Sequence, residues 1–265
     1  MHSKRWLAAL VFLPVFYLVV SSSSSVPFFI VAAIACALGQ WEFYRMCDGG
    51  PLVPLRITGV VAGLVLLFTF QAGCGDAAFL PLMTAIFLAL GTIRLFADRD
   101  TRGALLEIAV TFAGVVYVAG LLGHLILLRG MEQGGHLIFL LFLATWAGDT
   151  GAYYAGRSLG RHKLYEKISP KKTREGAIGG LLASIGAVLI AKFWFLPELS
   201  VGQCVVLGCL LGVSGQIGDL VESLIKRSLS VKDSGSIIPG HGGILDRVDS
   251  LLFSGPVLYY YLKYL

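Results

Sequence analysis

Long apolar segments alternate with short polar ones along almost the whole chain. A membrane-spanning helix needs about 20 mainly apolar residues, and the segments that approach this length run from Trp6 to Val20, Val26 to Tyr44, Leu55 to Phe70, Ala77 to Ala97, Ala104 to Leu128, Gly135 to Gly156, Gly176 to Leu196, Val201 to Ile225 and Ser250 to Leu265. The first, third and last are short for a bilayer. Because backbone polar groups must be paired in lipid, the pattern predicts an all-α, polytopic membrane protein with about nine transmembrane helices.

Composition agrees with this pattern. Hydrophobic residues make up 56% of the chain and mean hydropathy is +0.79. Only 14% of the residues are charged, against about 25% in a soluble domain. The five cysteines are odd in number and dispersed, so they form neither a disulfide framework nor a metal-binding spacing. These values exclude a soluble globular protein, and we expect no nucleic-acid partner.

The basic residues predict the orientation. If the N-terminus is cytoplasmic and the nine segments alternate, only Arg129, Lys192 and Lys263 fall on or near the outer side, which leaves 18 of the 21 Lys and Arg inside. Cytoplasmic loops are enriched in these residues. The first segment has an alternative, because a basic start, an apolar run and a serine run are also typical of a secretory signal peptide.

Ionisable residues within or beside membrane spans require a reason, and they concentrate in the C-terminal half. We therefore divide the chain into N-terminal helices over 1–134 and a catalytic region over 135–265, with cytoplasmic loops at 157–175 and 226–249. In the first region, Glu42 and Glu107 are single carboxylates near span ends, which we interpret as interfacial or structural. Arg94, Arg99 and Arg102 are interpreted as ordinary positive-inside anchors.

Three polar clusters lie on the predicted cytoplasmic side. Asp149 stands in TWAGDTGAYYAGRSLGRHK and is followed by the loop KISPKKTREG, and a third cluster runs from GQIGDLVESLIKR to Asp249. The segment from Arg157 to Arg174 carries seven basic residues against the single acid Glu166, whereas Asp219 to Asp249 carries five acids and four bases. A basic loop beside carboxylates is what a metal–polyphosphate substrate requires.

Helical spacing groups the acids. Asp219, Ser223 and Lys226 share one helix face, and Asp246 and Asp249 lie three residues apart on a helix leading into the last span. Oxygen-rich carboxylate sites suit Mg²⁺, so we predict a Mg²⁺ site formed by Asp219, Asp246 and Asp249 and leave open a second cation.

Glycines crowd the segment between these acids. Gly235, Gly240, Gly242 and Gly243 permit positive φ and close approach of the backbone to a ligand, although any tight turn uses such residues. The spacing of a P-loop is missing. His241 is interpreted either as a phosphate donor or as a residue that stabilises the turn.

The stretch SLIKRSLSVKDSGSIIPGHGGILDRVD, from Ser223 to Asp249, resembles the signature of phosphatidate cytidylyltransferases, also called CDP-diacylglycerol synthases. GDTGAYYAGRSLGRHKL and SPKKTREG upstream are also similar to that family, so the resemblance covers roughly 147–249. It implies that a cytidylyl group passes from CTP to phosphatidic acid, giving CDP-diacylglycerol and pyrophosphate. It also implies an integral protein of the cell's inner (cytoplasmic) membrane, an active site facing the cytoplasm, and a homodimer.

The motif and the clusters together give a set of candidate residues. The predicted catalytic residues are Asp219, Ser223, Lys226, Arg227, Lys232, Asp233, His241, Asp246, Arg247 and Asp249. The predicted substrate-binding residues are Asp149, Arg157, Ser169, Lys171, Lys172, Thr173, Gly242 and Gly243. Replacing Lys226 or Arg247 is expected to impair CTP use while membrane insertion stays near normal.

Two other functions compete with this one. A transporter or channel would use Asp149 and Asp219 on an ion path, but transporters usually place such groups near the bilayer midplane between repeats. The polar groups here crowd one interface and no repeat is visible. A lipid-alcohol kinase that uses CTP is a nearer alternative, and the full signature argues against it.

Overall fold

The computed structural model describes residues 13–47, 53–235 and 242–264, and this part of the chain is helical apart from one small hairpin. Residues 13–21 are helical. The elements that follow are α2 Val26–Arg45, α3 Arg56–Gln71, α4 Gly75–Leu95, α5 Ala104–Gly114, the π-helix η1 Val115–Gly120, α6 Leu121–Gly130, α7 Gly134–Leu159, β1 Lys163–Tyr165, β2 Ser169–Thr173, α8 Arg174–Trp194, α9 Val201–Ser228 and α10 Leu245–Tyr264. The helical fold predicted from the apolar segments is confirmed.

Five helical stretches among the described residues are long and apolar enough to cross a membrane: Val26–Arg45, Ala77–Leu95, Ala104–Gly130, Arg174–Trp194 and Val201–Ser228. The third combines α5, η1 and α6 into one helical rod, and Arg56–Gln71 is a shorter apolar helix. Large apolar side chains stand on outward faces, such as Leu80 at 73% exposure and Phe193 at 79%. Exposed apolar surface of this kind marks a lipid-facing protein, so the chain is membrane-embedded.

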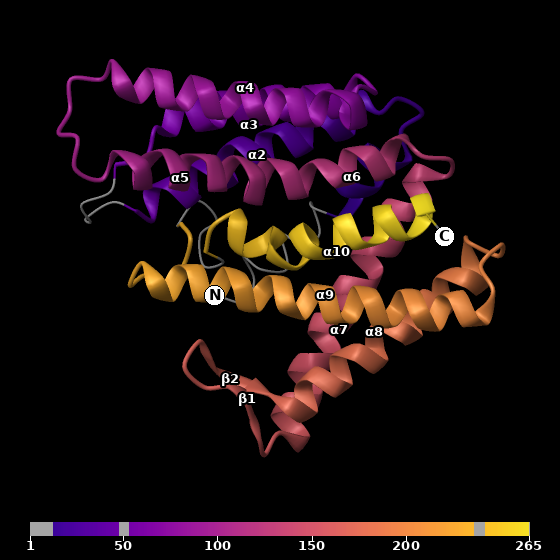
Figure 1. Ribbon diagram of the computed structural model, residues 1–265. Helices are drawn as coiled ribbons and strands as arrows, with labels where there is room; N and C mark the ends of the chain where they lie inside the picture. The colour runs from indigo at the N-terminus through magenta and orange to yellow at the C-terminus, as the bar shows by residue number, and fades with distance from the viewer. Residues whose placement is uncertain (1–12, 48–52, 236–241, 265) are drawn as a thin grey trace.

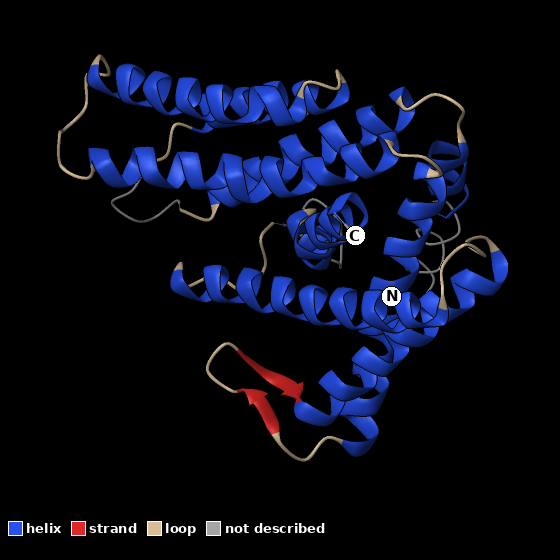
Figure 2. Cartoon of the chain, turned by 45° about the vertical axis from the view of Figure 1, so that its right-hand side comes forward, coloured by secondary structure: helices blue, strands red, loops and turns tan. Residues whose placement is uncertain are grey.

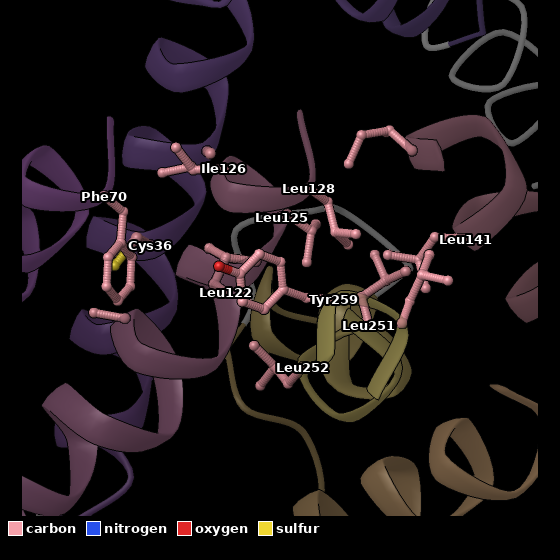
Figure 3. Close-up of a cluster of buried hydrophobic side chains, with 14 of the residues drawn as sticks. Cys36, Phe70, Leu122, Leu125, Ile126, Leu128, Leu141, Leu251, Leu252 and Tyr259 are labelled. Atoms are coloured by element: carbon pink, nitrogen blue, oxygen red, sulfur yellow. The ribbon is translucent and has the colours of Figure 1, made fainter. Parts of the chain in front are cut away.

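The helices form two groups with α10 between them. In Figures 1 and 2, α2 to α6 form one layer, and α10 lies between this layer and α9. Figure 3 shows the core at this junction, where Leu122 of α6 and Tyr259 of α10 lie side by side. The close approach is visible at Gly255, where a Cβ would lie 2.5 Å from Leu125. The last helix, which carries two predicted site aspartates, is thus anchored by both halves of the chain.

Helices α7 and α8 pack against each other through small residues. A Cβ on Gly151 would lie 2.5 Å from the Cβ of Ala183, and one on Gly179 would lie 2.3 Å from the Cβ of Ala155. The two backbones therefore approach more closely than larger side chains would allow. This contact places Asp149, on α7, beside the N-terminal end of α8.

The structure refines two expectations. Within the loop predicted over 157–175, β1 and β2 pair antiparallel, with Lys163 opposite Thr173. Arg94, interpreted from the sequence as a positive-inside anchor, is 4% exposed, and its Nε lies 2.6 Å from the Glu107 carboxylate. A buried cation requires such a partner, so this pair joins α4 to α5.

Candidate active site

A cleft of ≈390 Å³ opens between α7, the hairpin, α8 and α9. Its polar lining comes from all three predicted clusters and includes both acidic and basic side chains. The lining residues are Asp149, Ala152, Tyr153, Gly156, Arg157, Leu164, Lys171, Lys172, Thr173, Gly176, Ala177, Gln216 and Asp219. The cleft therefore unites the basic loop with acids of α7 and α9, as the charge pattern predicted.

The hairpin is held over this cleft by specific contacts. Lys172 of β2 lies 2.5 Å from the carboxylate of Asp219 on α9, and the two side chains remain 27% and 34% exposed. Thr173 caps α8 by accepting a hydrogen bond from the Gly176 N–H at 3.1 Å, which is a common role for Thr at this position. Arg157 donates to the hydroxyl of Tyr153 at 3.0 Å. The cationic groups thus point into a partly open cleft where a polyanion can reach them.

A second cluster of polar side chains lies where α9 ends and α10 begins. Lys226 is 8% exposed and donates to the carboxylates of Glu222 and Asp246, the latter at 2.5 Å. The other Asp246 oxygen, Oδ2, accepts from the N–H of Ser234 at 3.0 Å, its hydroxyl at 2.9 Å and the N–H of Gly243 at 2.8 Å. Asp246 therefore connects the signature's lysine to the loop between the two helices.

The remaining carboxylates lie where three helices meet. Asp149 of α7 and Asp219 of α9 line the same cleft, and α10 packs closely on α9 at Asp249, since a Cβ on Gly218 would lie 2.5 Å from the Asp249 carbonyl oxygen. Ser223 lies one turn from Asp219, and its hydroxyl is 3.5 Å from that carboxylate. Anions on neighbouring helices repel unless a cation lies between them, and oxygen donors of this kind suit a hard cation such as Mg²⁺.

The carboxylates are not gathered around a single point. Within the described ranges, no group of three His, Cys, Asp or Glu side chains is close enough to hold a metal ion. Asp246 and Asp249 both lie in α10 as predicted, but their contacts differ. Asp246 bonds to Lys226 and Ser234, whereas Oδ1 of Asp249 accepts from the Ser250 N–H and its backbone packs against α9. Because Oδ2 of Asp246 already accepts three hydrogen bonds, only its Oδ1 has acceptor capacity to spare.

The other predicted residues have different positions. Arg227 is exposed and donates to the carbonyl of Val231, and Lys232 and Asp233 are exposed beyond the end of α9. Arg247 is exposed on α10. Ser169 begins β2 and does not belong to the cleft lining. His241 lies outside the described residues.

Gly242 occupies a position that requires glycine in the turn that leads into α10. Gly242 alone of the described signature glycines has a positive φ, +78°, a conformation that disfavours any residue with a Cβ. A Cβ on Gly242 would also lie 2.6 Å from Oδ2 of Asp246. The glycine is therefore required by the backbone and by the aspartate beside it.

Some participants were missed in the sequence. Glu222 is fully buried and pairs with Lys226, and its i, i+4 spacing to the lysine was the available signal. Gln216 lines the cleft and donates to the Ala177 carbonyl at 3.0 Å. Ser234 gave no local signal. Glu42 stands out in the sequence as a carboxylate near a span end, but its partners could not be predicted because they are distant along the chain.

Comparison with known proteins agrees with the geometry of the cleft. The model of the cytidylyltransferase family matches residues 3–265. The chain belongs to this family. The match extends over the N-terminal helices, where the resemblance seen in the sequence was limited to hydrophobicity.

Individual relatives give more detail. The chain is 37% identical over 209 residues to a phosphatidate cytidylyltransferase of Staphylococcus saprophyticus, covering 77% of this chain and 78% of the relative. It is 38% identical over 208 residues to one of Staphylococcus aureus strain COL, covering 78% of each. It is also 41% identical over 191 residues to the uncharacterized protein YnbB of Escherichia coli, covering 70% of this chain and 63% of YnbB.

Proposed function

We propose that this protein transfers a cytidylyl group from CTP to phosphatidic acid, producing CDP-diacylglycerol and pyrophosphate for phospholipid biosynthesis. The observation that carries the proposal is the cleft in which Lys171, Lys172 and Arg157 face Asp149 and Asp219, in a family member similar to phosphatidate cytidylyltransferases. The signature of that enzyme class lies directly beside the cleft.

The reaction needs little covalent help from the protein. The phosphomonoester of phosphatidate is already an anionic nucleophile, so the main difficulty is bringing two polyanions together. Fixed cations overcome this repulsion and stabilise charge in the transition state. Lys171, Lys172 and Arg157 would bind the CTP phosphates in the cleft. Lys226, buried between Glu222 and Asp246, would act by holding Asp246 in place, and Arg247, exposed on α10, would bind a substrate phosphate outside the cleft.

We also propose that Mg²⁺ takes part. Asp219 and Asp249 would hold it, since α9 and α10 pack closely beside these residues, where a Cβ on Gly218 would lie 2.5 Å from the Asp249 carbonyl oxygen. Asp246 would contribute only through Oδ1. Mg²⁺ characteristically keeps waters and shares substrate phosphates while using few protein carboxylates. When bound, the ion would neutralise phosphate charge. A second cation is left open, and a homodimer is proposed from the family resemblance alone.

The membrane setting supports an active site on the cytoplasmic face. The helix ends predicted to be cytoplasmic contact one another: the hairpin meets α9 through Lys172 and Asp219, and α9 meets α10 through Lys226 and Asp246. Nine alternating spans, a cytoplasmic N-terminus and an inner-membrane location are part of the same proposal and rest on the charge pattern of the sequence and on the family resemblance. CTP is soluble and phosphatidate lies in the bilayer, so a site at this interface would receive both.

The test is direct. Protein purified in detergent would be incubated with Mg²⁺, phosphatidic acid and CTP labelled on its α-phosphate, which passes into CDP-diacylglycerol, or on its γ-phosphate, which passes into pyrophosphate or, in a kinase, into the lipid alcohol. Lipid and aqueous products would then be separated. We expect equal amounts of CDP-diacylglycerol and pyrophosphate. A parallel incubation with a lipid alcohol in place of phosphatidate separates a CTP-dependent kinase, which would release CDP. Label in a phosphorylated lipid alcohol, with none in CDP-diacylglycerol, would refute the proposal.

A further inference from the structure

Glu42, in the last turn of α2, is a buried carboxylate that faces the loop between α9 and α10. It is 2% exposed. Its Oε1 accepts a hydrogen bond from the N–H of Ile244 at 3.0 Å, and its Oε2 accepts one from the N–H of Leu245 at 2.9 Å. These N–H groups lie at the start of α10, where a helix has no internal acceptors for them. A residue more than 200 positions away in sequence thus caps the catalytic helix.

The same carboxylate contacts the loop at the end of α9. The hydroxyl of Ser234 lies 3.1 Å from Oε2 of Glu42. A Cβ built on Gly235 would lie 2.6 Å from Oε1, and one on Gly243 would lie 2.3 Å from Oε2. Glu42 therefore packs against the backbone of both glycines, at positions where any larger residue would displace its carboxylate.

Polar contacts continue from Glu42 to the predicted catalytic residues. Ser234 lies between Glu42 and Asp246, and its one hydroxyl proton can be donated either to Oε2 of Glu42 at 3.1 Å or to Oδ2 of Asp246 at 2.9 Å. Oδ1 of Asp246 in turn bonds to Lys226 at 2.5 Å. Every member of this chain of contacts is at least partly buried, so each side chain has few alternative partners.

We propose that Glu42 is a positioning residue for the cytidylyl transfer, one that fixes Ser234 and the first turn of α10 so that Asp246 and Lys226 keep their orientation. The inference rests on the proposed function and extends it to the N-terminal half of the chain. It predicts that α2 contributes to turnover without touching either substrate. A wild-type protein inactive on CTP and phosphatidate would refute the proposed function, whereas this proposal is judged on variants measured against an active wild type.

The first test is Glu42→Gln, which keeps the shape of the side chain. The amide NH₂ of Gln cannot accept a hydrogen bond, so it would lie against a group that now donates to Glu42. The N–H of Ile244 or of Leu245 would then lose its acceptor. We expect kcat to fall by about 10- to 100-fold, as for other groups that orient a site, while CTP binding measured without phosphatidate stays near wild type. The matched control is Glu107→Gln, which removes a buried glutamate bonded to Arg94. It should lower the unfolding temperature but keep kcat per folded molecule.

A second test does not depend on the stability of Glu42→Gln. The atoms nearest a Cβ on Gly235 all belong to Glu42, so Gly235→Ala should displace that carboxylate and lower kcat. Glu42→Asp shortens the side chain by one methylene and leaves room for the added methyl. If Glu42 and Gly235 act through this contact, the kcat of the double variant Glu42→Asp, Gly235→Ala should be no lower than the kcat of the poorer single variant. Losses that multiply independently, or an unchanged kcat in Glu42→Gln, would overturn the proposal.

Discussion

Lys226 and Lys172 are both basic residues near acids in the sequence, and the structure predicts opposite consequences for replacing them. Lys226 lies between Glu222 and Asp246, with side-chain exposures of 10%, 1% and 10% for the three residues. Lys226→Met keeps most of the apolar stem but leaves two buried carboxylates without their cation. Lys172→Met breaks a pair whose members are 27% and 34% exposed, so water solvates the remaining charge.

These exposures determine how much stability each substitution is expected to remove. Removing one partner of a buried ion pair costs roughly 3 to 5 kcal/mol, since the other charge stays buried and unpaired. A solvent-exposed pair contributes at most about 1 kcal/mol. Folded proteins are typically stable by only about 5 to 15 kcal/mol, so Lys226→Met should remove a large fraction of the stability. This differs from the sequence-based expectation that Lys226 variants insert and fold nearly normally.

The assay is unfolding in mixed micelles with increasing SDS, combined with CTP turnover per folded molecule. Lys226→Met should lower both the free energy of unfolding and turnover, whereas Lys172→Met should lower turnover alone. Adding Glu222→Gln to Lys226→Met removes one of the uncompensated charges and should restore part of the stability. Equal free energies of unfolding in the two lysine variants would refute the reasoning from burial.

Three further predictions concern the metal and the cleft. Excess EDTA should abolish turnover and added Mg²⁺ should restore it; full activity in EDTA would exclude a divalent cation. Asp249→Asn should fold but lose activity at least about a hundredfold, with roughly 2.7 kcal/mol per lost electrostatic contact as the guide, and near-normal turnover would make Asp249 a structural residue. Gly179→Val should separate α7 from α8, which would lower the free energy of unfolding by about 1 to 3 kcal/mol and raise the KM for CTP. The control Gly186→Val should change neither quantity, because no atom lies within 4 Å of its Cβ position. Equal effects of the two substitutions would refute the packing argument.

The sequence determined most of the helical architecture. Apolar segments of membrane-spanning length can only be helical in lipid, so the fold class followed from composition and periodicity. The charge division between the basic loop and the acidic stretch also predicted that Lys172 and Asp219 would share a site, and these two residues form an ion pair across the cleft. The pattern along the chain was sufficient for both predictions. Bilayer thickness sets the length of a whole apolar segment, and charge attraction brings a whole basic segment to an acidic one.

Tertiary structure decided which polar residues are partners. Asp246 and Asp249 lie one helical turn apart and are predicted from the sequence to share one site, yet Asp246 bonds to Lys226 and Ser234 whereas Asp249 accepts from the Ser250 N–H and packs against α9. Glu42 gave no local sign of its role, because its contacts join α2 to a loop near the other end of the chain. Helical periodicity places a side chain on a face, but only the packing of α2, α9 and α10 determines what that face meets. Hydrogen bonds are short and directional, so partners this distant in sequence follow from the assembled fold alone.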